Sequence, residues 1–245
     1  MDSFLVILAF GAAAALGDLV GGLILTAKKW REQAFLRSFI ALSVGFMLAV
    51  ALLKMIPESM HLTSQTPLFV LLGYLLVHFF EHTLASHFHF GEETHPEAMV
   101  GASVGYLAFL GLFVHSFFDG VSIASGFAVS HALGLLIFSA VFLHKVPEGF
   151  TIASIMLAAG AGRARALGSA ALIGLATIVG VLFLSLAPAL VAYALALSAG
   201  AILYVAASDL MPEVNKEVGP GMALLVFAGV LLFYLTEGLL SQFGF

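Results

Sequence analysis

Two stretches of this 245-residue chain share one pattern: His115-Ser-Phe-Phe-Asp-Gly-Val-Ser-Ile-Ala-Ser125 and His144-Lys-Val-Pro-Glu-Gly-Phe-Thr-Ile-Ala-Ser154. Both follow H-x-x-x-[DE]-G-x-[ST]-I-A-S, and the second begins 29 residues after the first. Residues four apart lie on one face of a helix, so each motif presents an imidazole beside a carboxylate. The doubled motif predicts two related helices that carry the same pair of ligands.

The composition around these motifs is that of a membrane protein. Hydrophobic residues make up 62% of the chain and charged residues only 9%, against about 25% charged residues in soluble domains. That leaves too little polar surface to cover a water-soluble globule. The net charge of -5, without a basic patch, argues against nucleic acid as a partner, and the absence of cysteine excludes disulfides and thiolate ligands. The lipid bilayer is the first partner we expect.

Apolar stretches long enough to cross a bilayer need roughly 20 residues, and the chain contains eight such stretches. We therefore expect an all-α, polytopic membrane protein with eight transmembrane helices in a single transmembrane domain, residues 1–245. The expected spans are 3–27, 34–57, 67–86, 99–128, 132–159, 166–186, 190–213 and 221–242.

The basic residues predict how the chain crosses the membrane. Those outside the spans, or at their ends, flank the first, fifth and seventh loops: Lys28, Lys29, Arg31, Arg37, Arg163, Arg165 and Lys216. Loops rich in Lys and Arg stay in the cytoplasm. We expect a multi-pass protein of the cell (inner or plasma) membrane with both termini outside the cytoplasm.

A second repeat extends the first. Residues 43–58 (SVGFMLAVALLKMIPE) resemble residues 198–213 (SAGAILYVAASDLMPE), 155 positions later. The two members of each repeat lie in spans of opposite direction, which is the pattern of inverted-topology repeats in transporters. The spans would then be arranged as three helices, a central pair and three helices (3+2+3). Spans 3–27 and 166–186 show no convincing similarity.

The two central motifs predict a metal site. His115 and His144 supply neutral nitrogen ligands, and Asp119 and Glu148 supply carboxylates, a set that suits Zn²⁺ and tolerates Fe²⁺, Mn²⁺, Co²⁺ or Cd²⁺. An acidic residue at mid-membrane costs about 2.5–3.5 kcal/mol on insertion scales, so such residues need a compensating partner. The alternative is a structural network of histidine, lysine and carboxylate groups that holds helices together.

The sequences HSFFDGVSIASG and HKVPEG resemble the paired signature of the ZIP family of divalent-metal transporters. The resemblance covers the whole chain and implies metal entry into the cytoplasm. It implies His115, Asp119, His144 and Glu148 as metal ligands. It also implies that Met47, in GFMLA, lies near the metal and that Asp209 lines the route that the metal takes through the protein. We also consider that two copies of the chain assemble as a homodimer.

The chain departs from the two-metal version of that signature. Ser116 and Lys145 stand where some members have ligands of a second metal, and span 166–186 contains no acid, with Thr177 nearest the expected position. We expect a single-metal variant in which the charge of Lys145 replaces the second ion and balances Asp119 and Glu148 in the empty site.

Several polar residues have less definite interpretations. Lys54 is expected either to pair with Asp209 or to extend to the outer interface. Pro57-Glu58 and Pro212-Glu213 are expected to end their helices, and the buried position of Asp18 is unexplained. The loop with His87, His89 and His95 is a weak metal acceptor or simply a solvated segment.

Together these features predict an uptake transporter, not an enzyme, that moves divalent transition metal, zinc first, by alternating access. The metal is substrate rather than cofactor. Since the ligands must be deprotonated, uptake should weaken at acidic pH. Two other functions stay open: an intramembrane zinc-dependent hydrolase, which normally needs an open coordination position, and a membrane protein that only senses metal. The repeats favour transport over both.

Overall fold

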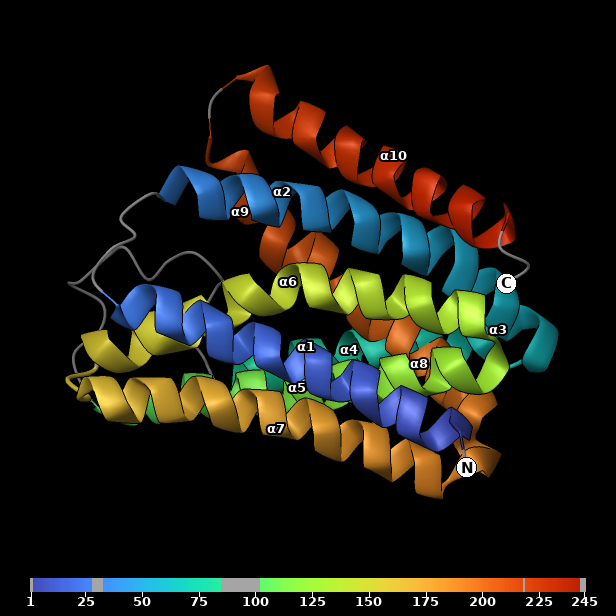
Figure 1. Cartoon of the computed structure of the whole chain (residues 1–245), viewed down its shortest axis with the longest axis horizontal. Helices are drawn as coiled ribbons and strands as arrows, with labels where there is room; N and C mark the ends of the chain where they lie inside the picture. The colour runs from blue at the N-terminus through green and yellow to red at the C-terminus, as the bar shows by residue number, and fades with distance from the viewer. Residues whose placement is uncertain (1, 28–32, 85–101, 218, 243–245) are drawn as a thin grey trace.

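The computed structural model describes residues 2–27, 33–84, 102–217 and 219–242, and within these ranges the regular structure is entirely helical. The elements, shown in Figure 1, are α1 (Asp2–Thr26), α2 (Gln33–Val50), η1 (Ala51–Met55), α3 (Ile56–Leu62), α4 (Thr66–Leu84), α5 (Ala102–Val129), α6 (His131–Ala158), α7 (Arg163–Leu186), η3 (Pro188–Leu190), α8 (Val191–Tyr204), η4 (Val205–Leu210), α9 (Met211–Asn215) and α10 (Pro220–Gln242).

These elements form eight rods, because α2, η1 and α3 are continuous, as are η3, α8, η4 and α9. Seven of the rods are long and apolar enough to cross a membrane, and the apolar part of α4, Thr66–Phe80, is shorter. Large apolar side chains such as Leu16, Leu175 and Phe227 are exposed on the outside of the bundle, as expected for a surface that faces lipid. The all-helical, multi-pass fold is confirmed.

The sequence predicts that two helices end at Pro57 and Pro212, and this prediction is wrong. Instead, a π-helical segment (η1 or η4) precedes each proline and the helix continues beyond it. Proline has no backbone N–H and crowds the carbonyl one turn earlier, so the preceding turn widens to relieve the clash. The N–H of Ile56 donates to Ala51 O, and the N–H of Met211 donates to Ala206 O.

Glycines bring the helices together in pairs. A Cβ at Gly149 of α6 would overlap the backbone oxygen of Asp18 in α1, and one at Gly21 of α1 would overlap that of Val146. Pair α5–α7 makes the corresponding contacts: Gly120 faces the backbone oxygen of Thr177, and Gly180 that of Phe117. Small residues thus allow direct backbone packing in both pairs.

The outer helices pair in the same way. Gly45 of α2 faces the backbone oxygen of Val226 in α10, and Gly229 of α10 faces that of Leu42. In the second outer pair, Gly73 of α4 faces Leu197 and Gly200 of α8 faces Val70. Figure 1 shows α10 lying along α2 at the edge of the bundle. The fold is therefore a set of four close helix pairs: α1–α6, α5–α7, α2–α10 and α4–α8.

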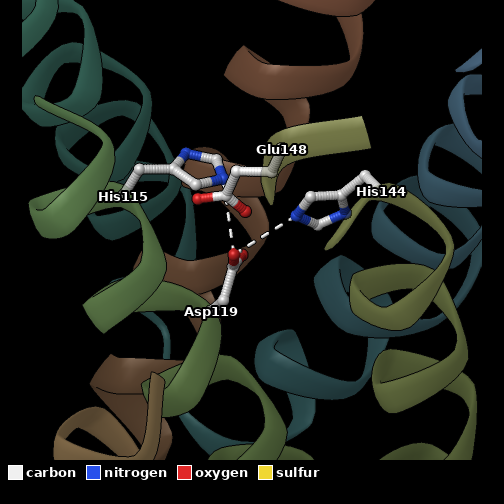
Figure 2. A group of neighbouring side chains, drawn as sticks. All are labelled: His115, Asp119, His144 and Glu148. Atoms are coloured by element: carbon white, nitrogen blue, oxygen red, sulfur yellow. Dashed lines mark hydrogen bonds and ion pairs between the residues drawn. The ribbon is translucent and has the colours of Figure 1, made fainter. Parts of the chain in front are cut away.

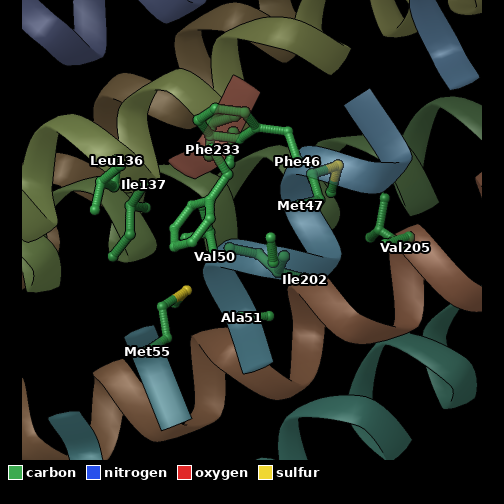
Figure 3. Close-up of a cluster of buried hydrophobic side chains, with 14 of the residues drawn as sticks. Phe46, Met47, Val50, Ala51, Met55, Leu136, Ile137, Ile202, Val205 and Phe233 are labelled. Atoms are coloured by element: carbon green, nitrogen blue, oxygen red, sulfur yellow. The ribbon is translucent and has the colours of Figure 1, made fainter. Parts of the chain in front are cut away.

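The largest apolar core lies where these pairs meet. Figure 3 shows Phe46, Met47 and Val50 of α2 facing side chains from α6, α8 and α10. The facing residues are Leu136, Ile137, Ile202 and Phe233. Pair α1–α6 contacts pair α5–α7 through α1 and α7 and also through α5 and α6, the two helices that carry the sequence motifs.

Candidate metal centre

The four predicted ligands converge. His115 and Asp119 come from α5, and His144 and Glu148 from α6. One ligand atom from each lies within 4.8 Å of the others, and all four side chains are buried. Figure 2 shows the two imidazoles and the two carboxylates directed at one another from the two helices. This arrangement places two nitrogen and two oxygen donors close enough together to bind a single ion.

One oxygen of Asp119 is the hub of the cluster. Oδ2 lies 3.3 Å from Nε2 of His115 and 3.2 Å from Nε2 of His144, as the dashed lines in Figure 2 indicate. On the other side of its ring, Nδ1 of His144 is 3.1 Å from the backbone oxygen of Ala140. A hydrogen bond from Nδ1 to that carbonyl fixes the tautomer and leaves Nε2 as the metal-binding atom.

Lys145 is fully buried within the same cluster. Its Nζ lies 2.9 Å from Oδ2 of Asp119 and 2.6 Å from Oε2 of Glu148, and it donates to Oγ of Ser116 at 2.7 Å. The hydroxyl of Ser116 in turn donates to Oε1 of Glu148 at 2.5 Å. The two residues that depart from the two-metal signature thus hold the carboxylates of the centre by hydrogen bonds.

Asp18 of α1 is the residue that the sequence did not explain. Its side chain is completely buried, and Oδ2 lies 3.6 Å from Nζ of Lys145. Thr177 of α7 is also completely buried, and its hydroxyl has no hydrogen-bond partner among the described residues. An acidic residue in an otherwise apolar span was the one sequence signal for Asp18, and its partner becomes evident only from the packing of α1 on α6.

The other two predicted site residues lie outside the cluster of four. Met47 is buried in the apolar core of Figure 3, and Asp209 is buried in the π-helical segment η4. Lys54, expected either to pair with Asp209 or to extend to the outer interface, forms an ion pair with Glu237 of α10. His87, His89 and His95 lie outside the described residues.

Comparison with known proteins agrees with the motifs. The family model described as the ZIP zinc transporter matches residues 92–235, which include α5, α6 and all four predicted ligands. No curated protein sequence matches the chain significantly.

Proposed function

Because the chain belongs to the ZIP zinc transporter family, whose model covers more than half of its length, we propose that it carries divalent transition metal, zinc first, into the cytoplasm. Divalent-metal transport is the function of the family as a whole. We infer that zinc is the first substrate, that Fe²⁺, Mn²⁺, Cd²⁺ or Co²⁺ are further substrates, and that transport is directed into the cytoplasm. Metal is then the substrate, and the chain performs no enzymatic reaction.

One observation carries this proposal: four ligand groups from two helices converge within 4.8 Å at a fully buried position. Ionised carboxylates at such a depth are costly unless a cation neutralises them. A network that only held helices together would not need both imidazoles to approach the same carboxylate oxygen of Asp119. A divalent ion at this point would satisfy both carboxylates and both histidines.

We propose a single metal ion at this centre. The ammonium of Lys145 is within hydrogen-bonding distance of both acidic ligands and so occupies the place beside the first ion. A protonated lysine cannot ligate, and its charge repels a second cation. Met47 and Asp209 are proposed as secondary contributors, one near the ion and one along its route.

The paired helices support the proposed 3+2+3 inverted repeat. Ala51 and Ala206, 155 positions apart, accept the same π-helical hydrogen bond. The glycine contacts of pair α2–α10 correspond to those of α8–α4, and those of pair α6–α1 to those of α5–α7. We infer that the pairs α1–α6 and α5–α7 carry the metal centre and move against α2–α10 and α4–α8 in alternating access.

The charge distribution supports the proposed orientation. α2, α7 and α10 begin at the same end of the bundle (Figure 1), and the basic residues Arg37, Arg163, Arg165 and Lys216 lie at or near these starts. The helix ends near the two chain termini lie at the opposite end. By the positive-inside rule, the basic end faces the cytoplasm and both termini lie outside the cytoplasm. The membrane that the protein spans is then the cell membrane.

The deciding experiment is flux of Zn²⁺ or Cd²⁺ into liposomes that contain the purified protein. We expect the wild type to move metal and His115→Ala and His144→Ala to lose this activity. Gly168→Ala is a matched control, since a methyl group at this site in α7 meets nothing within 4 Å. A wild type that moves no metal but cleaves a lipid or peptide would replace this proposal with the hydrolase alternative.

A further inference from the structure

The buried carboxylate of Asp18 has no role in the proposed ligand set. Neither of its side-chain oxygens accepts a hydrogen bond within the described part of the chain, although the residue is completely buried. A buried, unbonded carboxylate is costly and needs an explanation. Among the described residues it forms an ion pair with Nζ of Lys145, at 3.6 Å.

Lys145 makes closer contacts with the groups that a metal ion needs. Its Nζ lies 2.9 Å from Oδ2 of Asp119 and 2.6 Å from Oε2 of Glu148, while the second oxygen of Glu148 accepts from Ser116. An ion that binds these carboxylates must therefore compete with the ammonium, and it also repels it. Among the described residues, three carboxylates lie within 4.0 Å of Nζ, and only Asp18 lies outside the ligand set.

Backbone packing fixes Asp18 in this place. The backbone oxygen of Asp18 lies against Gly149, next to the ligand Glu148, and a Cβ at Gly17 would lie 2.9 Å from Cβ of Lys145. α1 is thus in contact with α6 at Lys145 itself and again one turn later, at Gly149. The carboxylate of Asp18 has little freedom to move away, whereas the long side chain of Lys145 can turn toward it.

We propose that Asp18 is a positioning residue that receives the ammonium of Lys145 when a divalent ion binds Asp119 and Glu148. Lys145 then exchanges a short contact with Glu148 for one with Asp18, and the acidic ligands are released to the ion. With neutral imidazoles, the three carboxylates and one ammonium leave a formal charge of −2, which one divalent cation neutralises. This inference rests on the proposed function, since it assumes that metal binds at the centre.

The position equivalent to Asp18 supplies a matched control. Gly149 faces the backbone oxygen of Asp18, and Gly120 faces that of Thr177 in the same way. Thr177 is likewise buried without a hydrogen-bond partner in the described ranges, but its side chain carries no charge. Thr177→Val therefore tests the effect of removing a buried oxygen at the equivalent place without removing a partner for the ammonium.

The test is a double-mutant cycle on the full-length protein in detergent, with Cd²⁺ affinity as the readout. Asp18→Asn should raise Kd about 10-fold or more, as the loss of a group that orients metal ligands usually does. In the Lys145→Met background the same change should alter Kd less than about twofold, since the lysine through which Asp18 acts is absent. Thr177→Val should bind as the wild type does.

Three outcomes would overturn the inference. If Asp18→Asn binds like the wild type, the residue has no part in metal binding. If the loss is as large in the Lys145→Met background, Asp18 is a direct ligand. If Thr177→Val loses as much, the effect is one of packing. Failure of the wild type itself to bind Cd²⁺ would instead contradict the proposed function.

A structure of the wild type with Cd²⁺ bound tests the same inference without a substitution at Asp18. Nζ of Lys145 should then lie within about 3 Å of Asp18, a charge-assisted hydrogen-bond distance, and should have left Glu148. A lysine that stays on Glu148 in the presence of the ion would refute the exchange of partners, whether or not Asp18→Asn folds.

Discussion

The helix pairs α1–α6 and α5–α7 make the same backbone contacts yet bring different chemistry to the metal centre. In each pair a glycine of the motif helix faces a backbone oxygen of its partner: Gly149 faces Asp18, and Gly120 faces Thr177. At corresponding positions, pair α1–α6 carries the charges of Lys145 and Asp18, while pair α5–α7 carries the hydroxyls of Ser116 and Thr177. The backbone packing, which we call the framework, is the same in the two pairs, but the charged side chains Lys145 and Asp18 occur in one pair only.

This difference separates two requirements on the sequence. Close packing of helices in a membrane depends on small residues and backbone shape, and both pairs meet it alike. The charged groups beside the ion depend on particular side chains, and the additional pair of opposite charges, Lys145 and Asp18, lies on one side of the centre. Substitutions at equivalent positions can therefore test the framework and the chemistry separately.

The largest effect is expected at the acidic ligands, and it should be unequal. Oδ2 of Asp119 contacts both histidines and Lys145, whereas Glu148 contacts Lys145 and Ser116. We expect Asp119→Asn to raise the Kd for Cd²⁺ at least about 100-fold, more than the loss of an outer partner would. Glu148→Gln should raise it by roughly 10-fold. Equal losses, measured by calorimetry, would mean that the ion sits midway between the carboxylates.

The framework should respond equally in its two halves. Gly120→Ala and Gly149→Ala each place a methyl group against a backbone oxygen of the partner helix, and each should lower stability by about 3 kcal/mol, the upper range for overpacking. Thermal unfolding in detergent measures this effect. Gly168→Ala is the control, and it should be neutral or slightly stabilising. A large difference between the first two variants would contradict the symmetric framework.

The hydroxyl of Ser116 should have a moderate effect. It accepts from Lys145 and donates to Glu148, so it holds these two groups in place. Ser116→Ala removes both hydrogen bonds and should change the Kd for Cd²⁺ by about fivefold, which corresponds to roughly 1 kcal/mol. The sign is informative: a tighter Kd would show that Ser116 helps the lysine to compete with the ion.

The smallest effect is expected at Met47. Its side chain is buried among apolar neighbours such as Val50 and Phe46, and leucine has a similar volume. Met47→Leu should change the Kd for Cd²⁺ less than about twofold, with transport measured in parallel. A loss above 10-fold would make the thioether an obligatory ligand and extend the metal centre toward α2.

Much of this organisation was predictable from the sequence, because the informative signals are local. Spans such as 99–128 and 166–186 agree with α5 and α7 within a few residues, since apolar length and charged breaks determine them. The spacing of His115 from Asp119, and of His144 from Glu148, places each pair on one helical face. The doubled motif then predicts that the two pairs meet, as they do.

The missed features depend on contacts between distant segments. No periodicity joins Asp18 to Lys145, and the equivalence of Gly21 and Gly180 becomes evident only when both are seen against a backbone oxygen. The sequence predicts helix ends at Pro57 and Pro212 because proline usually stops a helix. Within a membrane an unwound end would expose backbone groups to lipid, so the chain keeps its helix and widens one turn instead.

Those widened turns have a consequence for how one span serves two neighbours. A π-helical turn holds one residue more than an α-turn, so every side chain after it is rotated about the axis by the angle of one residue, about 100°. The first half of the rod that begins with α2 packs on α10 and α6, while α3, beyond η1, packs on α8 and α4. A single extra residue thus lets one continuous rod present a different contact face after η1 than before it. Deleting one residue from η1 would keep the helix but turn one of its halves toward the wrong partner.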